Sequence, residues 1–163
     1  MHLTAETSFT EKMEALGYDL ETRTIDCEKI PYNEQIYQIL GIEKSDTVHK
    51  IGRLRYIDGE PTAIHYSFVS ETTIPQIKDD GSKIQSMFAY YRQHGYDEFS
   101  NRTSLLSITF PTASEQQLLG CKSMVPLILV ESDCVDSKTG KVLEYTKTLY
   151  RSDKFKYDIT MNS

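Results

Sequence analysis

Two arginines, Arg53 and Arg55, stand two residues apart in the stretch IGRLRYIDGEPTAIHYSFV, residues 51–69. Side chains alternate along a β-strand, so both guanidinium groups would lie on one face of a strand here. Each guanidinium can donate two parallel hydrogen bonds to a phosphate or a carboxylate. The pair therefore predicts an anion site. The alternative is that both arginines are solvated, or paired with Asp and Glu across the sheet.

The turn signal Asp58-Gly59 predicts a hairpin that can form in two registers. A two-residue loop would pair Arg53 with Ile64, whereas a three-residue loop would pair Arg53 with His65. The hydrophobic pattern favours the second register, because a slip of one residue moves every side chain to the other face. In that register the core face holds Leu54, Tyr56, Ile64, Tyr66 and Phe68. The opposite face is a basic, hydrogen-bonding surface with Arg53, Arg55, His65 and Ser67.

A second hairpin is predicted around the segment VLEYTKTLYR, residues 142–151. One face of this strand would carry Glu144, Thr146, Thr148 and Tyr150. The other face would carry Leu143, Tyr145, Lys147 and Leu149. Glu144 could accept hydrogen bonds from ligand hydroxyls, or it could form a cross-strand ion pair.

The elements that must position these residues are short. Four helices are indicated by an N-cap residue before each and a glycine after each, at 8–18, 33–42, 82–96 and 112–121. Segments rich in β-branched and aromatic residues indicate strands near 20–30, 47–57, 61–70, 99–110, 124–135, 142–151 and 154–160. The hairpin connections are too short for parallel crossovers. We therefore expect an α+β fold, with an antiparallel sheet and flanking short helices.

The chain also resembles itself. The segment IPYNEQIYQILGI (30–42) is similar to FPTASEQQLLGC (110–121), and each precedes a strand, a turn with glycine and another strand. This spacing predicts an internal pseudo-repeat of two helix–hairpin units. Coincidence of common capping motifs is the alternative.

Composition excludes several functional classes. The chain has 163 residues, which fits one domain, and a net charge of −6, which does not fit nucleic-acid binding by the chain as a whole. Three widely spaced cysteines predict neither a disulfide framework nor a zinc ribbon. The chain contains no membrane-length apolar run and no signal peptide pattern. We expect a cytoplasmic protein without membrane contact.

Motifs for catalysis are absent from the sequence. The four histidines have no metal-ligand spacing, and no phosphate-binding loop, dinucleotide fingerprint or nucleophile elbow occurs. The prediction is a protein that is not an enzyme and has no catalytic residue, metal or cofactor. A lone histidine such as His65 is more often structural than a base.

Taken in order, SFTEKMEALGY, the two helix segments above, VHKIGRLRYIDGEPTAIHYSFV and GKVLEYTKTLYRSDKFKY carry a family likeness. The chain closely resembles the UTRA domain, the effector-binding module of GntR-type bacterial transcription regulators of the HutC subfamily. The likeness covers about residues 7–160, and we treat residues 1–163 as this one domain.

The resemblance implies a fold like that of chorismate lyase. It also implies a small anionic effector, such as a phosphorylated sugar, and a homodimer. Operator DNA would be contacted only through an N-terminal winged helix-turn-helix domain, which is absent from this sequence. The full-length protein would then be a repressor whose DNA binding the effector modulates.

Site residues implied by the resemblance fall at both hairpins and at the first predicted helix. Arg53 and Arg55 would grip the anion together with the helix start, which is Ser8, Phe9 and Thr10. Glu144 would contact sugar hydroxyls, and Tyr150 would contribute from the Tyr-Arg motif. The segment 97–107 would also line the pocket, through Ser100, Arg102 or Ser104.

The chain departs from the family pattern at His65, where relatives that bind amino-sugar phosphates carry Glu, and at Phe68, where they often carry Tyr. The departure leaves the identity of the ligand open. Two alternatives to an effector module remain. One is a chorismate lyase-like enzyme that acts on an aromatic carboxylate, and the other is a dimerisation module with an empty pocket.

Overall fold

The computed structural model describes residues 2–3, 13 and 15–157. In these residues the main sheet is built from β2 (Leu20–Lys29), β3 (Val48–Ile57), β4 (Glu60–Ser70), β5 (Phe99–Ser100), β6 (Ser104–Thr109), β7 (Leu127–Asp136) and β8 (Val142–Arg151). The helices are α2 (Glu34–Leu40), α3 (Ile77–Asp80), the 3₁₀ turn η1 (Gly81–Lys83), α4 (Met87–Gln93) and α5 (Ala113–Leu119). A small parallel pair joins β1 (His2–Leu3) to β9 (Lys156–Tyr157).

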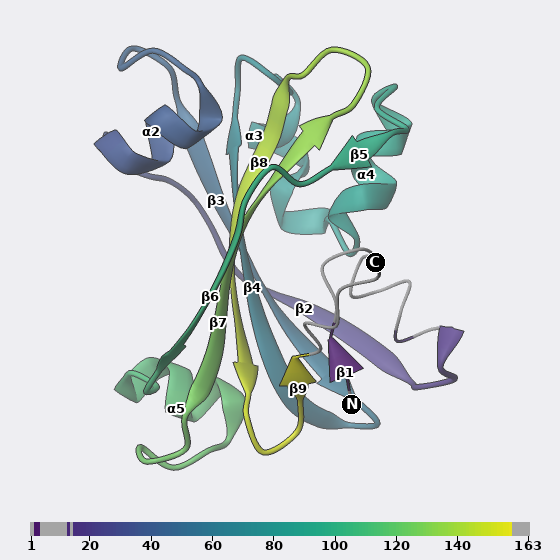
Figure 1. The fold of residues 1–163 in the computed structure, drawn as a ribbon, viewed down its shortest axis with the longest axis vertical. Coiled ribbons are helices and arrows are strands. Elements are labelled where there is room, and N and C mark those ends of the chain that lie inside the picture. Colours follow the sequence, from purple (N-terminus) through teal and green to yellow (C-terminus); the bar gives the residue numbers. More distant parts are fainter. Residues whose placement is uncertain (1, 4–12, 14, 158–163) are drawn as a thin grey trace, which may run out of the picture.

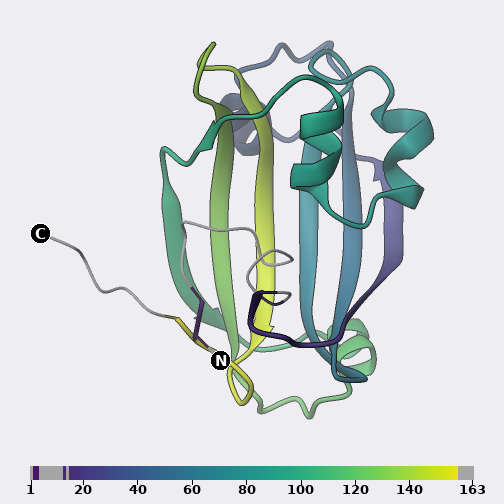
Figure 2. The ribbon, with the colours of Figure 1, turned by 90° about the vertical axis from the view of Figure 1, so that its right-hand side faces the viewer.

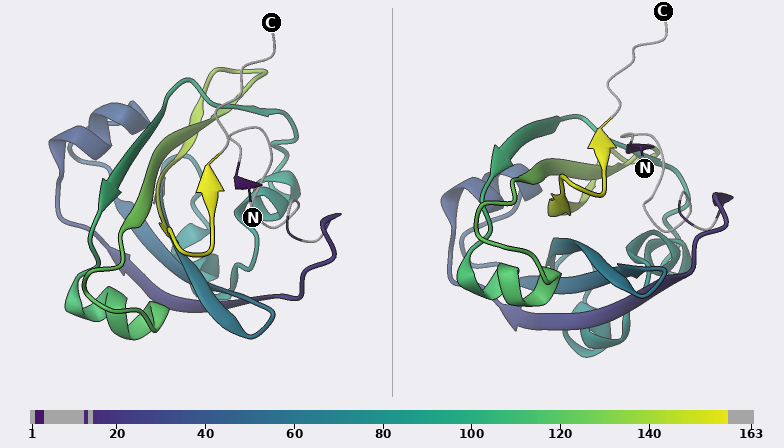
Figure 3. Two further views of the ribbon diagram at one scale, coloured as in Figure 1. Left: turned by 60° about the horizontal axis from the view of Figure 1, so that its bottom comes forward. Right: turned by 90° about the horizontal axis from the view of Figure 1, so that it is seen from below.

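The seven strands form one antiparallel sheet in the order β2-β3-β4-β8-β7-β5, with β6 also paired to β7. Helices α2 and α5 lie on one side of the sheet, while α3 and α4 lie on the other (Figure 1). Viewed after a quarter turn, α3 and α4 cover only one end of their side (Figure 2). The sheet is strongly curved when seen along its strands (Figure 3). The predicted α+β class is confirmed.

The order of the strands shows the predicted pseudo-repeat. An outer strand, a helix and a hairpin occur as β2-α2-β3-β4 and again as β6-α5-β7-β8. The last strands of the two units, β4 and β8, pair antiparallel in the middle of the sheet, from Ala63–Tyr150 to Phe68–Tyr145. The sheet is therefore two similar halves that meet at this seam.

Helix ends follow the predicted caps in two of the four cases. The side chain of Asn33 caps α2, and Thr112 with Glu115 forms a capping box at α5. The predicted start at Ser82 is wrong, because this residue lies in η1 and the side chain of Ser86 caps α4. The predicted start of the first helix at Ser8 lies outside the described residues.

The first hairpin has the predicted strand pairing, but its turn differs from the predicted one. Arg53 pairs with His65, as expected. The loop is the two-residue turn Asp58-Gly59, with φ of 50° and 81°, rather than a three-residue loop. Positive φ at both positions is the type I′ geometry whose twist matches that of the strands. A β-bulge at Thr62 supplies the one-residue shift that restores the predicted pairing.

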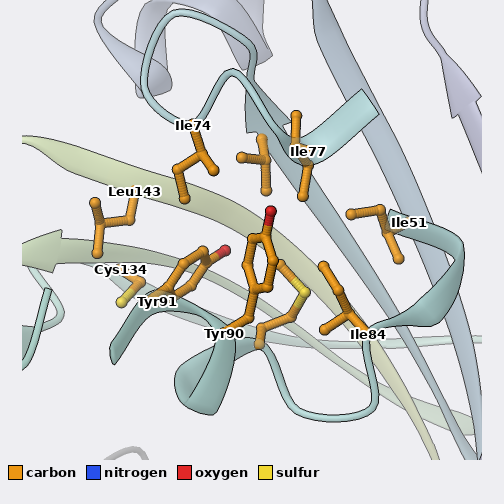
Figure 4. Packing of buried hydrophobic residues seen from close by; sticks show 10 residues of the cluster. Ile51, Ile74, Ile77, Ile84, Tyr90, Tyr91, Cys134 and Leu143 are labelled. Atoms are coloured by element: carbon orange, nitrogen blue, oxygen red, sulfur yellow. The ribbon is translucent and has the colours of Figure 1, made fainter. Parts of the chain in front are cut away.

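Both faces of the sheet carry core. Under α2 and α5 lie two apolar clusters that include Phe68 and Leu149. On the other face, one cluster packs beneath α3 and α4 and includes Ile51 and Tyr91, as Figure 4 shows. A further cluster at the opposite end of that face holds Met13, Ile57, Ala63, Ile128, Tyr150 and Phe155. The arginine-bearing face is thus apolar at both ends and polar between them.

Candidate functional site

The middle of this face is an interior polar site. Arg53 and Arg55 are each only 3% exposed, and Ser67 is fully buried. The alternative of solvated arginines is therefore wrong, because both side chains are buried. Burying a charge is costly unless hydrogen bonds or opposite charge compensate it. The site is thus built to hold cationic groups out of water.

Neutral oxygen atoms accept hydrogen bonds from both arginines. Arg53 donates from Nη1 to the carbonyl oxygen of Gln85, at 3.2 Å, and from Nη2 to Oγ of Ser67, at 3.4 Å. Arg55 donates from Nη1 to Oγ1 of Thr22, at 2.7 Å. In the described part of the chain, the buried Nε of Arg53 has no hydrogen-bond partner. Arg53 thus retains a buried donor that an anionic ligand could use.

Glu144 is the buried carboxylate on this face and is 3% exposed. It accepts a hydrogen bond of 2.6 Å from the hydroxyl of Tyr91, which projects from α4. Burial raises the pKa of Glu144, while the Tyr91 hydrogen bond and the charge of Arg53 oppose the rise. Burial and Glu144 hold the pKa of Tyr91 well above its ordinary value. Its hydroxyl therefore stays protonated and acts as a hydrogen-bond donor.

Charged side chains are buried together on this face. The guanidinium groups of Arg53 and Arg55 and the carboxylate of Glu144 are all buried here. Burial lowers the pKa of Arg53, and the charge of Glu144 opposes this. An arginine stays protonated in proteins at any working pH. The face therefore keeps charged donors inside the protein, and a guanidinium can bind an anion through parallel hydrogen bonds.

His65 lies beside the arginines on β4, opposite Thr148 of β8. Its ring meets that of Tyr150 edge-on, with the ring centroids 5.8 Å apart. Burial, followed by the charges of Arg55 and Arg53, holds the pKa of His65 well below its ordinary value. The imidazole is therefore neutral near pH 7, and one ring nitrogen can accept while the other donates.

Six of the predicted site residues come together on this face: Arg53, Arg55, His65, Ser67, Glu144 and Tyr150. Tyr150 and Glu144 lie toward opposite ends of β8. Both act to raise the pKa of Arg53, against the effect of burial. Ser8, Phe9 and Thr10 lie outside the described residues.

Arg102 is not part of this cluster. It pairs from Nε with Oδ2 of Asp133, at 3.3 Å, and its side chain is 58% exposed. It lines a groove of about 540 Å³ between α2 and the edge of the sheet, together with residues such as Gln38 and Leu105. The structure thus separates Arg102 from the buried arginines.

Sequence reasoning missed three residues of the site, namely Thr22, Gln85 and Tyr91. Thr22 is on β2, opposite Arg55. The sequence indicated a strand near 20–30 but not which strand it pairs with. Gln85 contributes its backbone carbonyl, for which no side-chain signal exists. Tyr91 lies in the amphipathic segment of α4, where the pattern predicts that an aromatic residue belongs to the hydrophobic core.

The site combines groups that can bind a polar, anionic ligand. It offers guanidinium donors, a neutral imidazole and a carboxylate, with hydroxyls of Ser67, Thr146 and Thr148 on the same strands. Among the described residues, no group of three or more His, Cys, Asp or Glu side chains is placed to hold a metal ion. No helix of the described segments is long and apolar enough to cross a membrane.

Comparison with known proteins points to one family. The family model for the UTRA domain matches residues 15–156. The HTH-type transcriptional repressor NagR of Bacillus subtilis is 26% identical over 93% of this chain and 61% of the relative. The HTH-type transcriptional regulator GgaR of Escherichia coli is 25% identical over 90% of this chain and 57% of the relative. The chain thus spans about three fifths of the length of these relatives.

Solved structures share the fold. The effector domain of PhnF from Mycobacterium smegmatis superposes with a TM-score of 0.88 at 19% identity, over 100% of both chains. The ligand-binding domain of a GntR-family transcriptional regulator from Bordetella bronchiseptica gives a TM-score of 0.76 at 18% identity, over 88% of this chain and 90% of that chain. At this level of identity the likeness establishes the fold alone.

Proposed function

The chain belongs to the UTRA domain family, and from this premise we propose that it is the effector-binding module of a GntR-type transcription regulator. Its effector is a small anionic metabolite of the sugar phosphate class. The ligand binds between the two apolar clusters, on the face of the sheet that carries Arg53 and Arg55. The role is that of a sensor rather than an enzyme.

One observation carries this proposal. Two arginines are buried on the same face of β3, and the buried Nε of Arg53 has no hydrogen-bond partner among the described residues. A protein that used these residues only for stability would lose little by replacing them with apolar groups. A buried guanidinium donor that the described residues leave unused is therefore best explained by an anion that occupies the site for part of the time.

The remainder of the site favours a ligand with hydroxyl groups. Glu144 accepts hydrogen bonds, and the hydroxyls of Thr146 and Thr148 share its face of β8. His65 is neutral and can serve as donor or acceptor toward the same ligand. Glu in its place would add a negative charge beside the anion. A neutral ring at this position therefore favours a ligand with one anionic group and an uncharged polyol part.

The regulatory role extends beyond the described residues and is part of the proposal. The relatives are HTH-type regulators of greater length, so we infer an attached winged-helix domain that reads operator DNA in the cytoplasm. Two half-sites require two copies of the reader, which implies a homodimer. The effector would shift the population between dimer arrangements that can and cannot span the operator, and thereby relieve repression.

Thermal denaturation in the presence of hexose 6-phosphates and hexosamine 6-phosphates tests the binding step. A ligand at about 100 times its Kd should stabilise the domain by about 2.7 kcal/mol. Inorganic phosphate should stabilise it less, and the unphosphorylated sugars should have no effect at equal concentration. The Arg53→Gln, Arg55→Gln double variant should lose the stabilisation.

Arg102→Gln is the matched control, because it removes the same charge from the groove beside α2. It should retain the full ligand response. If the double variant folds poorly, Arg55→Gln alone replaces it, with circular dichroism as the check on its fold. Stabilisation that persists without the arginines would reject this site, and no response to any phosphorylated sugar would reject the ligand class.

A further inference from the structure

Arg151 is the last residue of β8, and its side chain joins three separate segments of the chain. Its Nη1 donates to the carbonyl oxygen of Leu119 at the end of α5, at 3.1 Å, and to that of Pro61 near the start of β4, at 3.4 Å. Its Nε and Nη2 donate to the two carboxylate oxygens of Asp153, at 3.1 Å and 2.7 Å. The side chain is 14% exposed. Arg151 therefore ties β8 to α5 and to the first hairpin.

Arg151 itself lies off the binding face. Successive side chains of a strand point to opposite faces of the sheet. Tyr150 lies on the face that carries Arg53, whereas Arg151 reaches the side on which α5 packs (Figure 1). Any effect of Arg151 on a ligand beside Arg53 is therefore indirect and passes through the residues that it holds.

One of its partners, Pro61, belongs to the β-bulge of the first hairpin. The register of β3 and β4 shifts by one residue here, with Thr62 as the extra residue. A bulge interrupts the hydrogen-bond ladder, so backbone groups beside it need other partners. The hydroxyl of Thr62 donates to the carbonyl oxygen of Arg55, at 3.3 Å, and Arg151 donates to that of Pro61. Two side chains thus satisfy carbonyl groups at the bulge.

The bulge decides which residues of β4 share a face with the arginines. In the structure Arg53 pairs with His65. Without the extra residue, the two-residue turn Asp58-Gly59 would pair Arg53 with Ile64, and His65 would turn to the opposite face. The composition of the binding face therefore depends on whether the bulge is kept.

We propose that Arg151 is a positioning residue of the ligand site. It holds the bulge at Thr62, and through the bulge it keeps His65 on the face of Arg53 and Arg55. The effect on ligand binding rests on the proposed function, whereas the effect on the position of His65 does not. The alternative is an Arg151 that only stabilises the end of α5 and the turn before β9, and whose loss leaves the binding face unchanged.

Proton NMR of the His65 ring reports its position without any ligand. In the unmodified chain the ring lies beside two guanidinium groups, so its signals, identified by their absence in His65→Gln, should stay constant between about pH 5.5 and pH 7.5. Arg151→Met keeps the length of the side chain but has no donor. It should show a second set of His65 signals that titrates near the ordinary pKa of about 6.5.

Thr62→Val removes the other donor at the bulge and should give the same second set of signals. It decides the question if Arg151→Met does not fold. A single His65 ring that does not titrate, in every folded variant of these two, would overturn the proposal.

Conservative variants separate the carbonyl contacts from the ion pair. Arg151 contacts both carbonyl groups through Nη1 alone, and a lysine ammonium can donate to both but cannot form the fork to Asp153. Arg151→Lys should therefore restore the single His65 signal, and Asp153→Asn should keep it. A second set of signals in Asp153→Asn as large as that in Arg151→Met would assign the effect to the turn and would overturn the proposal.

Glu60→Gln is the matched control. Lys154 pairs with Glu60 at 2.7 Å and so joins the same hairpin to the same turn, but the side chain of Glu60 is 61% exposed. Exposed ion pairs contribute little. Glu60→Gln should leave the His65 signals unchanged, and a displaced ring in this variant would show that any loosening of the hairpin moves His65, against a specific role of Arg151.

Calorimetric titration with glucose 6-phosphate and glucosamine 6-phosphate links the position of His65 to binding. Affinity should fall in proportion to the population that keeps His65 in place, so a second set with about nine tenths of the intensity corresponds to about tenfold weaker binding. A lower melting temperature of Arg151→Met with unchanged affinity would show a structural role only and would overturn the proposal. If the unmodified chain binds neither sugar phosphate, the proposed ligand class fails, and the His65 signals still decide the role of Arg151.

Discussion

The hydrogen bond between Tyr91 and Glu144 joins a helix to the sheet inside the binding face. Both side chains are buried, and the oxygen atoms are 2.6 Å apart. Removing one partner leaves a buried acceptor without its donor, which costs more than the bond itself contributes. Tyr91→Phe should therefore lower the free energy of unfolding by about 1–3 kcal/mol in urea denaturation.

Tyr90→Phe is the matched control for this prediction. Its hydroxyl donates to Asp80 at 2.8 Å, at a partly buried position where water can replace it. The loss there should be below about 1 kcal/mol. Equal losses in both variants would mean that the Tyr91 hydroxyl has no special role, and that Glu144 finds another donor.

His65 makes the stability of the fold depend on pH. Its pKa is held well below the ordinary value in the folded state, so below about pH 6.5 the unfolded chain binds a proton that the folded chain refuses. The stability linked to the neutral His65 is fully present above the pKa of the unfolded chain, and it is lost as the pH falls toward the pKa of the folded state. Between pH 7 and pH 5 the native protein should lose about 1–2 kcal/mol more than His65→Gln does, as measured by urea denaturation at each pH.

His94→Gln serves as the comparison, because His94 lies at the end of α4. It should keep the steep pH dependence of the unchanged protein. A saturating phosphorylated sugar should reduce the effect, since an anion beside Arg53 and Arg55 offsets the charges that disfavour protonation. Identical pH profiles for the native chain and His65→Gln would contradict a depressed pKa at this position.

At the residue level, the sequence predicted which face of a strand each residue occupies, but not whether that face is buried. Alternation along a strand was enough to place Arg53, Arg55, His65 and Ser67 on one face. It did not show that this face is buried, because burial depends on α3, α4 and distant segments that pack over it. Nor could it show that Tyr91 meets Glu144, since 53 residues separate them in the chain.

Helix α4 positions two of the contacts that the binding face requires. The carbonyl of Gln85, just before it, accepts from Arg53, and Tyr91 within it donates to Glu144. Its N-cap is Ser86, whose side chain accepts from the amide of Ala89. Ser86→Ala should destabilise the domain by about 1 kcal/mol, measured by thermal and urea denaturation.

The control for this cap is Ser82→Ala, at the residue that the sequence pattern indicated as the cap. The described contact of Ser82 is through its carbonyl, which accepts from the hydroxyl of Thr24 and is unchanged by the substitution. Its stability should stay within about 0.5 kcal/mol of the unmodified chain. A larger loss at Ser82 than at Ser86 would contradict the helix start in the structure.

At the level of the elements, caps and glycines located α2 and α5, while bulges escaped prediction. The bulge at Thr62 keeps Arg53 opposite His65 despite a two-residue turn. A second bulge, at Leu143, moves this residue away from the Tyr145 face on which alternation had placed it, into the cluster with Ile51. A bulge depends on packing across the sheet, so alternation within one strand cannot reveal it.

At the level of the whole molecule, the proposed binding face crosses the seam between the two halves of the pseudo-repeat. Arg53, Arg55 and His65 belong to the first half, and Glu144 and Tyr150 to the second. The repeat was visible in the sequence because both halves need the same helix caps and hairpin turns. The halves differ in their charged residues. The first carries the arginines and a charged outer strand, whereas the second carries the buried carboxylate and an apolar outer strand.

A ligand that bridges this seam should therefore protect distant segments together. An anion bound to Arg53 and Arg55, with hydroxyls on Glu144, would hold β3, β8 and the start of α4 in one arrangement. Hydrogen exchange followed by mass spectrometry should then slow in residues 84–91 and 142–150 when a phosphorylated sugar saturates the domain.

Helices α2 and α5 lie on the opposite face and should change little, which makes them the internal reference. Ligands raise protection most where they restrict local opening. Protection limited to one half of the repeat would place the ligand beside the seam rather than across it, and would exclude Glu144 from its contacts.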